Sequence, residues 1–318
     1  MNMGNAILEL KNLKKYFPTK AGLLHAVDDV SLSIDSGETL GLVGESGCGK
    51  STIGRLAIRL LDPTEGSVFF EGTDITRLDR KSMHMMRRKM QIVFQDPYSS
   101  LDGRKSVFES IGEPLRVQKI YPSKQEYEKR VYELMDIAGL ATRLANSYPH
   151  ELDGGRRQRV GIARALALNP SFLVLDEPVS ALDVSIQAQV LNLMQQLQRD
   201  LKLTYLFISH DLGVVKHIST HIAVMYLGVM VEKAPAKELF ANPKHPYTQA
   251  LLSAIPIPSI DVHQERIVLE GDVPSPIAPK PGCRFAGRCR YCQSICRERS
   301  PEMRECSPGH FVACHCAD

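Results

Sequence analysis

Residues 39–52 read TLGLVGESGCGKST, and this stretch decides the fold. Its first five residues form a short apolar run, which is typical of a strand buried on both faces of a parallel sheet. The residues from Gly44 to Thr52 fit the pattern G-x-x-x-x-G-K-[ST], and an amphipathic segment at 51–61 predicts a helix after them. A strand, a glycine-rich loop and a helix in this order indicate a phosphate-binding loop. An ordinary Gly/Ser turn lacks that context.

The loop supplies the donors that a phosphate chain needs. Glycines let successive backbone N–H groups point inward, and the start of the helix adds its dipole. Lys50 offers a point charge to the outer phosphates, and the hydroxyl of Ser51 is a ligand for Mg²⁺. We expect Cys48 to be a small loop residue and not a nucleophile. The residues expected to bind the nucleotide here are Gly44, Glu45, Ser46, Gly47, Cys48, Gly49, Lys50, Ser51 and Thr52.

A second candidate element is the run FLVLDE at residues 172–177. Four apolar residues ending in an acid predict a buried strand that delivers Asp176 to its carboxyl end, where the carboxylate can hold Mg²⁺ directly or through water. Glu177 is expected to point to the opposite face of the chain and to reach an attacking water, as a general base. Such a run is common by itself, and it gains weight from the phosphate loop.

The rest of the chain alternates strands and helices, which implies a parallel sheet with helices on both faces. Strands are expected at residues 6–13, 26–34, 66–70, 90–94, 172–176 and 204–208, and helices at 51–61, 127–138 and 185–201. Residues 97–167 are helical in pattern, and the apolar run 222–231 has the length of a strand or a core helix. After residue 239 the composition shifts, and PSPIAPKPG at 274–282 predicts no regular structure.

Composition narrows the class of protein. The 318 residues are 43% hydrophobic and 24% charged, with a formal net charge of +3, which argues weakly against a dedicated nucleic-acid surface. No apolar run approaches the roughly 18 residues needed to span a bilayer, and no signal peptide is evident, so we expect a protein that is cytosolic or peripheral on the cytosolic side. Seven of the eight cysteines lie between Cys283 and Cys316, a cluster that favours metal binding over disulfides.

Further motifs resemble those of ATP-binding-cassette proteins. LDGGRRQR at 152–159 is similar to the signature motif of that family, and it lies shortly before the acidic strand. Gln95 in IVFQDP, SALD at 180–183 and His210 in ISHD complete a set whose order and spacing cover about residues 7–235. The resemblance implies an α/β fold, with a P-loop NTPase (RecA-like) core, an antiparallel β subdomain and a helical subdomain at about 97–165. It divides the chain into a nucleotide-binding domain, 1–245, and a small Cys-rich extension, 246–318.

The resemblance also implies roles for individual residues. ATP is hydrolysed between the phosphate loop of one subunit and the signature helix of a second, and closure of the pair drives a separate membrane channel. An aromatic residue stacks on adenine, and Phe17 aligns best with that position, with Tyr16 as the alternative. The implied catalytic residues are Lys50, Glu177 and His210, and the implied magnesium ligands are Ser51, Gln95 and Asp176. The implied signature residues are Leu152, Asp153, Gly154, Gly155 and Arg156, and the implied dimer-contact loop is Ser180, Ala181, Leu182 and Asp183.

The segment NPKHPYT at 242–248, the Pro-rich stretch and the Cys tail resemble one subfamily, the ATPase subunits of bacterial oligopeptide and dipeptide importers. That likeness implies two transmembrane permease subunits, an extracytoplasmic solute-binding protein, no nucleic acid, and a peripheral place on the cytoplasmic face of the inner membrane. An importer of nickel or another small solute is the nearest alternative. A soluble cassette that acts on nucleic acid or ribosomes is a second, although the chain has neither tandem cassettes nor a coiled-coil insertion. A non-catalytic regulatory cassette is disfavoured because Lys50, Asp176, Glu177 and His210 are all present.

The signature departs from the family pattern L-S-G-G-Q, since Asp153 replaces Ser and Arg156 replaces Gln. An ionised Asp153 facing the γ-phosphate of the opposite subunit repels it, and Arg156 compensates in part. We therefore expect pairing with a second, non-identical ATPase subunit, which leaves one competent and one poor site. Harmless sequence drift is the alternative.

The cysteine spacing resembles the tail of peptide-importer ATPases that carry a [4Fe–4S] cluster. The matching positions are Cys283, Cys289, Cys296 and Cys314, with Cys292, Cys306 and Cys316 as extras. Four thiolates in one compact region can close such a cluster, and a four-cysteine zinc site is the main rival. Free thiols are the third possibility. Fastening a Pro-rich tail that lacks its own core is sufficient reason for a metal centre.

Overall fold

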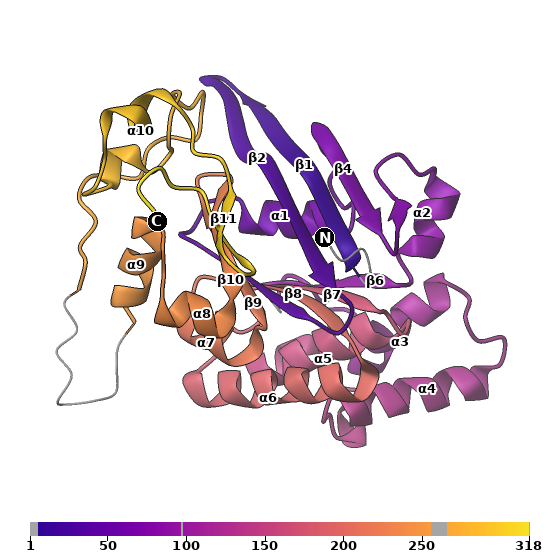
Figure 1. Ribbon diagram of the computed structural model, residues 1–318. Helices are drawn as coiled ribbons and strands as arrows, with labels where there is room; N and C mark the ends of the chain where they lie inside the picture. The colour runs from indigo at the N-terminus through magenta and orange to yellow at the C-terminus, as the bar shows by residue number, and fades with distance from the viewer. Residues whose placement is uncertain (1–5, 97, 256–265, 318) are drawn as a thin grey trace. The chain divides into compact units, whose positions relative to one another are not determined.

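The computed structural model describes residues 6–96, 98–255 and 266–317 (Figure 1). The chain forms two compact units. The first takes in the chain up to Arg77 and again from Phe207 onwards, and the second is Leu78–Leu206.

An antiparallel sheet forms one part of the first unit. Its strand order is β2-β1-β4-β5, and β1 (Ala6–Thr19) and β2 (Gly22–Asp35) form a long hairpin in which Thr19 pairs with Gly22. The strands predicted at 6–13 and 26–34 are therefore confirmed, and both are longer than expected. Several register shifts interrupt the β1–β2 pairing, so each strand bends and twists instead of ending.

The central strand of the first unit is β3 (Thr39–Val43), all five residues of which are buried. It pairs in parallel with β9 (His221–Tyr226), and β9 turns back into β10 (Val229–Pro235) as a hairpin. The apolar run 222–231 is thus two strands, because Leu227 and Gly228 adopt positive φ between them. Two strands from the C-terminal extension, β12 (His310–Val312) and β11 (Arg304–Ser307), continue the sheet beyond β10.

The remaining elements of the first unit are the other two strands of the antiparallel sheet and a set of helices and turns (Figure 1). They are β4 (Glu65–Phe70), β5 (Thr73–Asp74), α1 (Lys50–Ala57), α7 (Leu212–Ile218), α8 (Ala236–Ala241), α9 (Pro246–Ser253), α10 (Ser294–Glu298) and the 3-10 turn Ala286–Arg288. The strand β8 (Thr204–Ser209) contains the point at which the two units divide. The helix predicted at 51–61 ends at Ala57, because the chain reaches a left-handed conformation at Arg59.

The second unit contains a parallel strand pair and a group of helices. The strands are β6 (Met90–Val93) and β7 (Phe172–Asp176), in register from Met90 opposite Phe172 to Val93 opposite Leu175. The helices are α2 (Arg80–Met86), α3 (Val107–Val117), α4 (Lys124–Ile137), α5 (Gly154–Leu166) and α6 (Val184–Leu201), with 3-10 turns at Thr142–Leu144 and Pro149–Glu151. The helical pattern expected from 97 to 167 is therefore three α-helices with turns between them.

The extension and the phosphate loop lie in the same compact unit. The boundary expected at residue 245 lies inside the first unit. Strand β10 precedes this boundary in the sequence and β12 follows it, and the two strands pair at Glu232 and Lys233 of β10. The cause is main-chain hydrogen bonding, since a strand added to a sheet edge satisfies N–H and C=O groups that are otherwise unpaired.

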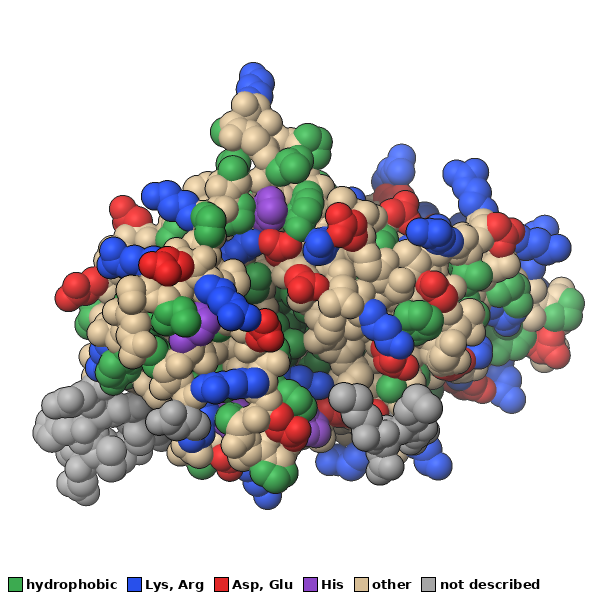
Figure 2. All heavy atoms as spheres, turned by 45° about the horizontal axis from the view of Figure 1, so that its top comes forward, with side chains coloured by type: hydrophobic (Ala, Val, Ile, Leu, Met, Phe, Trp, Pro, Cys, Tyr) green, Lys and Arg blue, Asp and Glu red, His purple; other side chains and the backbone are tan. Residues whose placement is uncertain are grey.

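Charged side chains of both signs are interspersed on the face shown in Figure 2. Within the residues that the structure describes, no helix combines the length and the apolar character that a membrane crossing requires.

Candidate nucleotide-binding site

The phosphate loop leaves no room for side chains at two of its glycines. Gly49 has φ of 106°, and a Cβ there meets the carbonyl oxygen of Ala26 at 2.1 Å. Gly44 has φ of 153°, and a Cβ there meets the carbonyl oxygen of Met225 at 2.2 Å. Backbone from β2 and β9 therefore lies directly against the loop, and only glycine permits this approach.

Lys50 is buried and curls over its own loop. Its Nζ donates to the carbonyl oxygens of Gly44 at 2.8 Å and Glu45 at 2.9 Å. It is the first residue of α1, whose N-cap is Gly49 and has no side-chain cap. A positive charge therefore lies at the positive end of a helix dipole, which favours an anion in front of it. Burial raises the pKa of the Cys48 thiol, in keeping with a small loop residue.

Glu45 is fixed by residues from the C-terminal part of the chain. Its backbone N–H donates to the hydroxyl of Tyr247 at 2.9 Å. Its two carboxylate oxygens accept from Nη1 of Arg288 at 3.1 and 3.0 Å. Sequence reasoning missed both partners, because Tyr247 and Arg288 lie about two hundred residues from the loop and no spacing rule links them to it.

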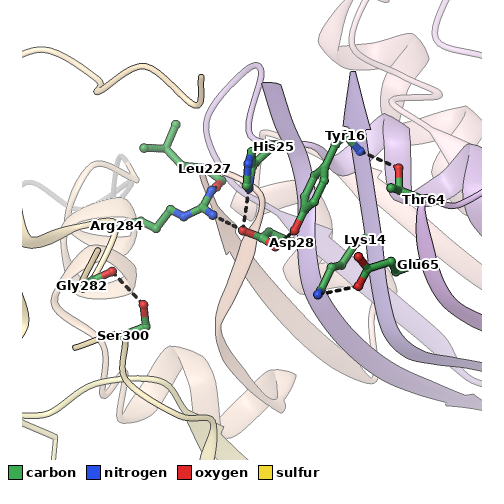
Figure 3. Close-up of polar contacts among 10 residues, drawn as sticks. All are labelled: Lys14, Tyr16, His25, Asp28, Thr64, Glu65, Leu227, Gly282, Arg284 and Ser300. Carbon is green, nitrogen blue, oxygen red and sulfur yellow. Dashed lines mark hydrogen bonds and ion pairs between the residues drawn. The ribbon is translucent and has the colours of Figure 1, made fainter. Parts of the chain in front are cut away.

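The aromatic strand β1 carries the two candidates for adenine stacking, and they differ in their contacts. Figure 3 shows one of them, Tyr16. The ring of Tyr16 stacks on His25 with 4.0 Å between ring centroids, and its hydroxyl donates to Asp28. Burial and the bond to Asp28 together raise the pKa of Tyr16. The ring of Phe17 has Nζ of Lys15 at 5.2 Å from its centroid. The ring and the hydroxyl of Tyr16 are therefore both held against β2.

His210 also belongs to the first unit. It follows the end of β8 and is exposed. The next residue, Asp211, caps α7 by accepting from the N–H groups of Gly213 and Val214. The helix cap fixes the backbone on the carboxyl side of His210 and so limits where the imidazole points.

In the second unit, the structure brings Gln95 and Glu177 together. They follow the carboxyl ends of the paired strands β6 and β7, and Nε2 of Gln95 donates to Oε2 of Glu177 at 3.1 Å. Asp176 is buried at the end of β7. Glu177 has φ of 47°, so the strand ends at Asp176. The sequence suggested that the two carboxylates alternate as neighbours on a strand do, but a turn of the backbone separates them.

The signature residues open α5. Asp153 is its N-cap, and Oδ1 accepts from the N–H of Arg156 at 2.8 Å. The guanidinium of Arg156 lies 3.4 Å from Oδ2 of the same carboxylate. Asp153 therefore caps the helix as a serine would, and Arg156 neutralises part of the charge of its carboxylate.

The signature and the dimer-contact loop are packed against each other. A Cβ on Gly154 meets Leu182 at 3.1 Å, and a Cβ on Gly155 meets Ile186 at 2.6 Å. The hydroxyl of Ser180 donates to the carbonyl oxygen of Glu177 at 3.1 Å, which joins this loop to the acidic strand. The loop 180–183 thus contacts the signature through Leu182 and the residue after the acidic strand, Glu177, through Ser180.

The cysteines of the extension lie together. Burial raises the pKa of Cys283 to about 11, and the thiols of Cys296, Cys314 and Cys289 act on it as near neighbours. Burial likewise raises the pKa of Cys316 to about 11, again with Cys296, Cys314 and Cys289 as neighbours. Across residues 6–96, 98–255 and 266–317, however, no three His, Cys, Asp or Glu side chains are arranged as a metal-ion site.

Comparisons with known proteins identify the family of this chain. The family model described as "ABC transporter" matches residues 27–180, and "Oligopeptide/dipeptide transporter, C-terminal region" matches 231–296. The oligopeptide transport ATP-binding protein AppF of Bacillus subtilis is 54% identical over 97% of this chain and 97% of its own length. This chain belongs to the ABC transporter family. OppF of the same organism, also an oligopeptide transport ATP-binding protein, is 52% identical over 98% of this chain and 97% of its own.

Solved structures of ABC cassettes support the same assignment. The ATP-binding cassette MJ0796, in a dimeric post-hydrolysis state with ADP and Pi, is 31% identical and has a TM-score of 0.66, covering 72% of this chain and 98% of its own. CbiO1 of Clostridium perfringens, part of an ABC transporter complex, is 28% identical with a TM-score of 0.66, covering 75% and 92%. The predicted α/β fold of a P-loop nucleotide-binding cassette is confirmed, and so is the prediction of an ATPase of this family.

Proposed function

We propose that this ABC transporter protein is the ATP-hydrolysing subunit of an importer of dipeptides or oligopeptides. The observation that carries the proposal is the 54% identity with an oligopeptide transport ATP-binding protein over nearly the whole of both chains. The match includes the extension, to which a family model for peptide transporters corresponds at residues 231–296. Importers of nickel or other small solutes remain the nearest alternative.

The first unit is assigned the nucleotide. In this proposal the loop 44–52 wraps the phosphates, Lys50 meets the outer phosphates and Phe17 stacks on the base. The hydroxyl of Ser51 ligates Mg²⁺, and His210 contacts the γ-phosphate. The buried position of Lys50, over an uncapped helix start, supports this assignment.

The second unit is assigned the attacking water and the remaining magnesium ligands. Glu177 accepts a proton from the water, Asp176 holds Mg²⁺, and Gln95 senses the metal. The hydrogen bond from Gln95 to Glu177 supports this arrangement, because an amide donor fixes the orientation of the carboxylate beside the expected magnesium site.

The partner assembly follows from the same proposal. The signature 152–156 faces the nucleotide of a second ATPase subunit, which we take to be non-identical, and the loop 180–183 lies at that contact. The assembly contains two permease subunits and a solute-binding protein, with this chain peripheral on the cytoplasmic face of the membrane. The dimeric state of the similar cassette MJ0796 supports pairing of two cassettes.

The extension is assigned a metal centre held by Cys283, Cys289, Cys296 and Cys314. The assignment is supported by the neighbouring thiols, which act on one another's pKa, and four thiols are the donor set of a [4Fe–4S] cluster and also of a structural zinc site. In the described residues these thiols are not arranged as a metal-ion site, so the assignment requires them to move closer together when the metal binds. We favour iron–sulfur. When bound, the centre would tie three separate segments of the extension together, a structural role that requires no redox step.

The test is a comparison of variants in the full chain. Glu177→Gln should keep ATP affinity while hydrolysis falls by at least about a hundredfold, because the general base is lost. Lys50→Ala should lower both. A control variant, Lys124→Ala in an exposed ion pair, should match the wild type. Reconstitution with candidate permeases in liposomes, with peptides or nickel ions as solute, then identifies the cargo. ATP turnover that Glu177→Gln does not reduce would contradict the assignment of the base.

A further inference from the structure

One residue of the phosphate loop carries a negative charge that faces the extension. Glu45 immediately follows Gly44, and its side chain is 28% exposed. A carboxylate next to a triphosphate site is unfavourable for binding, since both carry negative charge and part of the solvent is excluded. Unless its charge is compensated, Glu45 should therefore weaken the binding of a triphosphate by this loop.

Arg288 supplies a compensating charge. Its side chain is only 10% exposed, and one guanidinium nitrogen contacts both oxygens of Glu45 at 3.0 and 3.1 Å. The same nitrogen lies 3.5 Å from the hydroxyl of Tyr226. Burial lowers the pKa of Arg288, but the bonds to Tyr226 and Glu45 outweigh it and leave the pKa raised. The guanidinium of Arg288 thus forms a charged, hydrogen-bonded pair with the carboxylate of Glu45.

An aromatic cluster keeps that arginine in place. Tyr226, Tyr247 and Phe285 pack edge to face or tilted, with ring centroids 4.7 to 5.5 Å apart. All three are buried, and Tyr247 also accepts the N–H of Glu45. Because Phe285 and Arg288 belong to one short segment, this packing fixes the segment against the loop.

The same segment contacts β2 at a second point (Figure 3). Arg284 forms an ion pair with Asp28 and donates to the carbonyl oxygen of Leu227 at 2.7 Å. Asp28 in turn accepts from Tyr16 and contacts His25. The loop from Cys283 to Cys289 therefore contacts the phosphate loop and also β2, whose Asp28 is in turn bonded to Tyr16 of β1.

We propose that Arg288 is a positioning residue for ATP binding, which acts through Glu45 by neutralising its charge and holding the first turn of the phosphate loop. This inference rests on the proposed nucleotide site. It makes the extension a working part of the ATP site, because removal of Arg288 leaves an uncompensated carboxylate beside the triphosphate.

The test is a double-mutant cycle in the full chain. Arg288→Ala, Glu45→Gln and the double variant are titrated with Mg-ATP by calorimetry, together with the wild type. Arg288→Ala should weaken ATP binding on the order of tenfold in the wild-type background, since it adds one net negative charge at the site. In the Glu45→Gln background the same substitution should change affinity less than about twofold, because the charge to be neutralised is gone.

Two further measurements separate this role from simple support of the fold. The loss caused by Arg288→Ala should shrink at high salt, since part of the repulsion is screened. In steady-state hydrolysis it should raise KM more than it lowers kcat. Arg288→Lys keeps the charge and should bind ATP close to the wild type, and it serves as the second variant if Arg288→Ala does not fold. Arg299→Ala, in the exposed pair with Glu302, is the matched control.

An equal effect of Arg288→Ala in both backgrounds, or none in either, overturns the inference. So does a loss in Arg288→Lys as large as that in Arg288→Ala. Failure of the proposed function has a different signature, namely wild-type protein that binds no Mg-ATP or binds it regardless of Lys50→Ala.

Discussion

His310 and Glu232 form a fully buried pair, with Nε2 of the imidazole 2.7 Å from Oε1 of the carboxylate and neither side chain accessible to solvent. Oε1 of Glu232 also accepts the N–H of Lys244 at 2.7 Å, and Oε2 accepts that of His245 at 3.0 Å. One carboxylate in β10 thus joins the segment 242–248 and strand β12. The extension is fastened to the cassette through this group as well as through strand pairing.

The first prediction concerns that pair. His310→Ala should destabilise the first unit by about 3 kcal/mol, because it leaves a buried carboxylate without its imidazole. Denaturant unfolding followed by circular dichroism measures the change. Lys124→Ala, in the exposed pair with Glu128, is the control and should leave the midpoint where it is. An unchanged midpoint in His310→Ala would show that the pair does not stabilise the fold.

The second prediction is a pH dependence. Burial lowers the pKa of His245 to about 4, from an ordinary value of 6.5, and its Nδ1 accepts the N–H of Tyr247 at 3.1 Å. In the unfolded chain the imidazole of His245 is protonated below about pH 6.5, whereas in the folded chain it is protonated only below about pH 4. Stability should fall by about 3 kcal/mol as the pH drops through that window, and no loss from this group is expected above it.

His245→Asn tests the assignment, since an asparagine oxygen keeps the helix cap without titrating. Unfolding free energies of this variant should lose that part of the slope between pH 6.5 and 4. The exposed residue His84 provides the matched control, and His84→Asn should keep the slope of the wild type. A slope in His245→Asn as steep as that of the wild type would rule out His245 as its source.

The third prediction separates two effects of Asp153. Asp153→Ser keeps the cap on α5 and should leave the unfolding free energy nearly unchanged, whereas Asp153→Ala should lower it by about 1 kcal/mol. If charge at the signature is what weakens a site made of two copies of this chain, Asp153→Ser should raise the ATPase rate of the protein by itself. Full and cooperative hydrolysis by the purified wild-type chain would contradict pairing with a non-identical subunit.

The fourth prediction concerns the thiol cluster. Protein purified without oxygen should contain about four iron atoms and four sulfide ions per chain and show broad visible absorbance. Cys283→Ser or Cys314→Ser should lose them, and Cys292→Ser, outside the proposed ligand set, should not. Zinc without iron on elemental analysis decides for the rival site, and the absence of both metals decides against a metal centre.

Much of the fold was predictable from the chain alone because its signals are local. The buried strand 172–176 was predicted to the residue, because a run of four apolar residues that ends at an acid has the length of a buried strand and is too short for a helix. The hairpin at 222–231 was not resolved, because a two-stranded apolar run and a longer single element look alike until the turn at Leu227 and Gly228 is seen. The conformation of Glu177 likewise depends on the turn that follows and not on strand alternation.

The amino-acid sequence by itself determined the phosphate loop, the acidic strand and the signature, because each depends on residue types within a few positions of one another. Only the tertiary structure decided what holds them. Arg288 and Tyr247 reach Glu45, Arg284 reaches Asp28, and Gln95 reaches Glu177 across large separations in the chain. Such contacts depend on which sheet edges pair and which aromatic rings pack, and these are properties of the folded chain that no local pattern encodes.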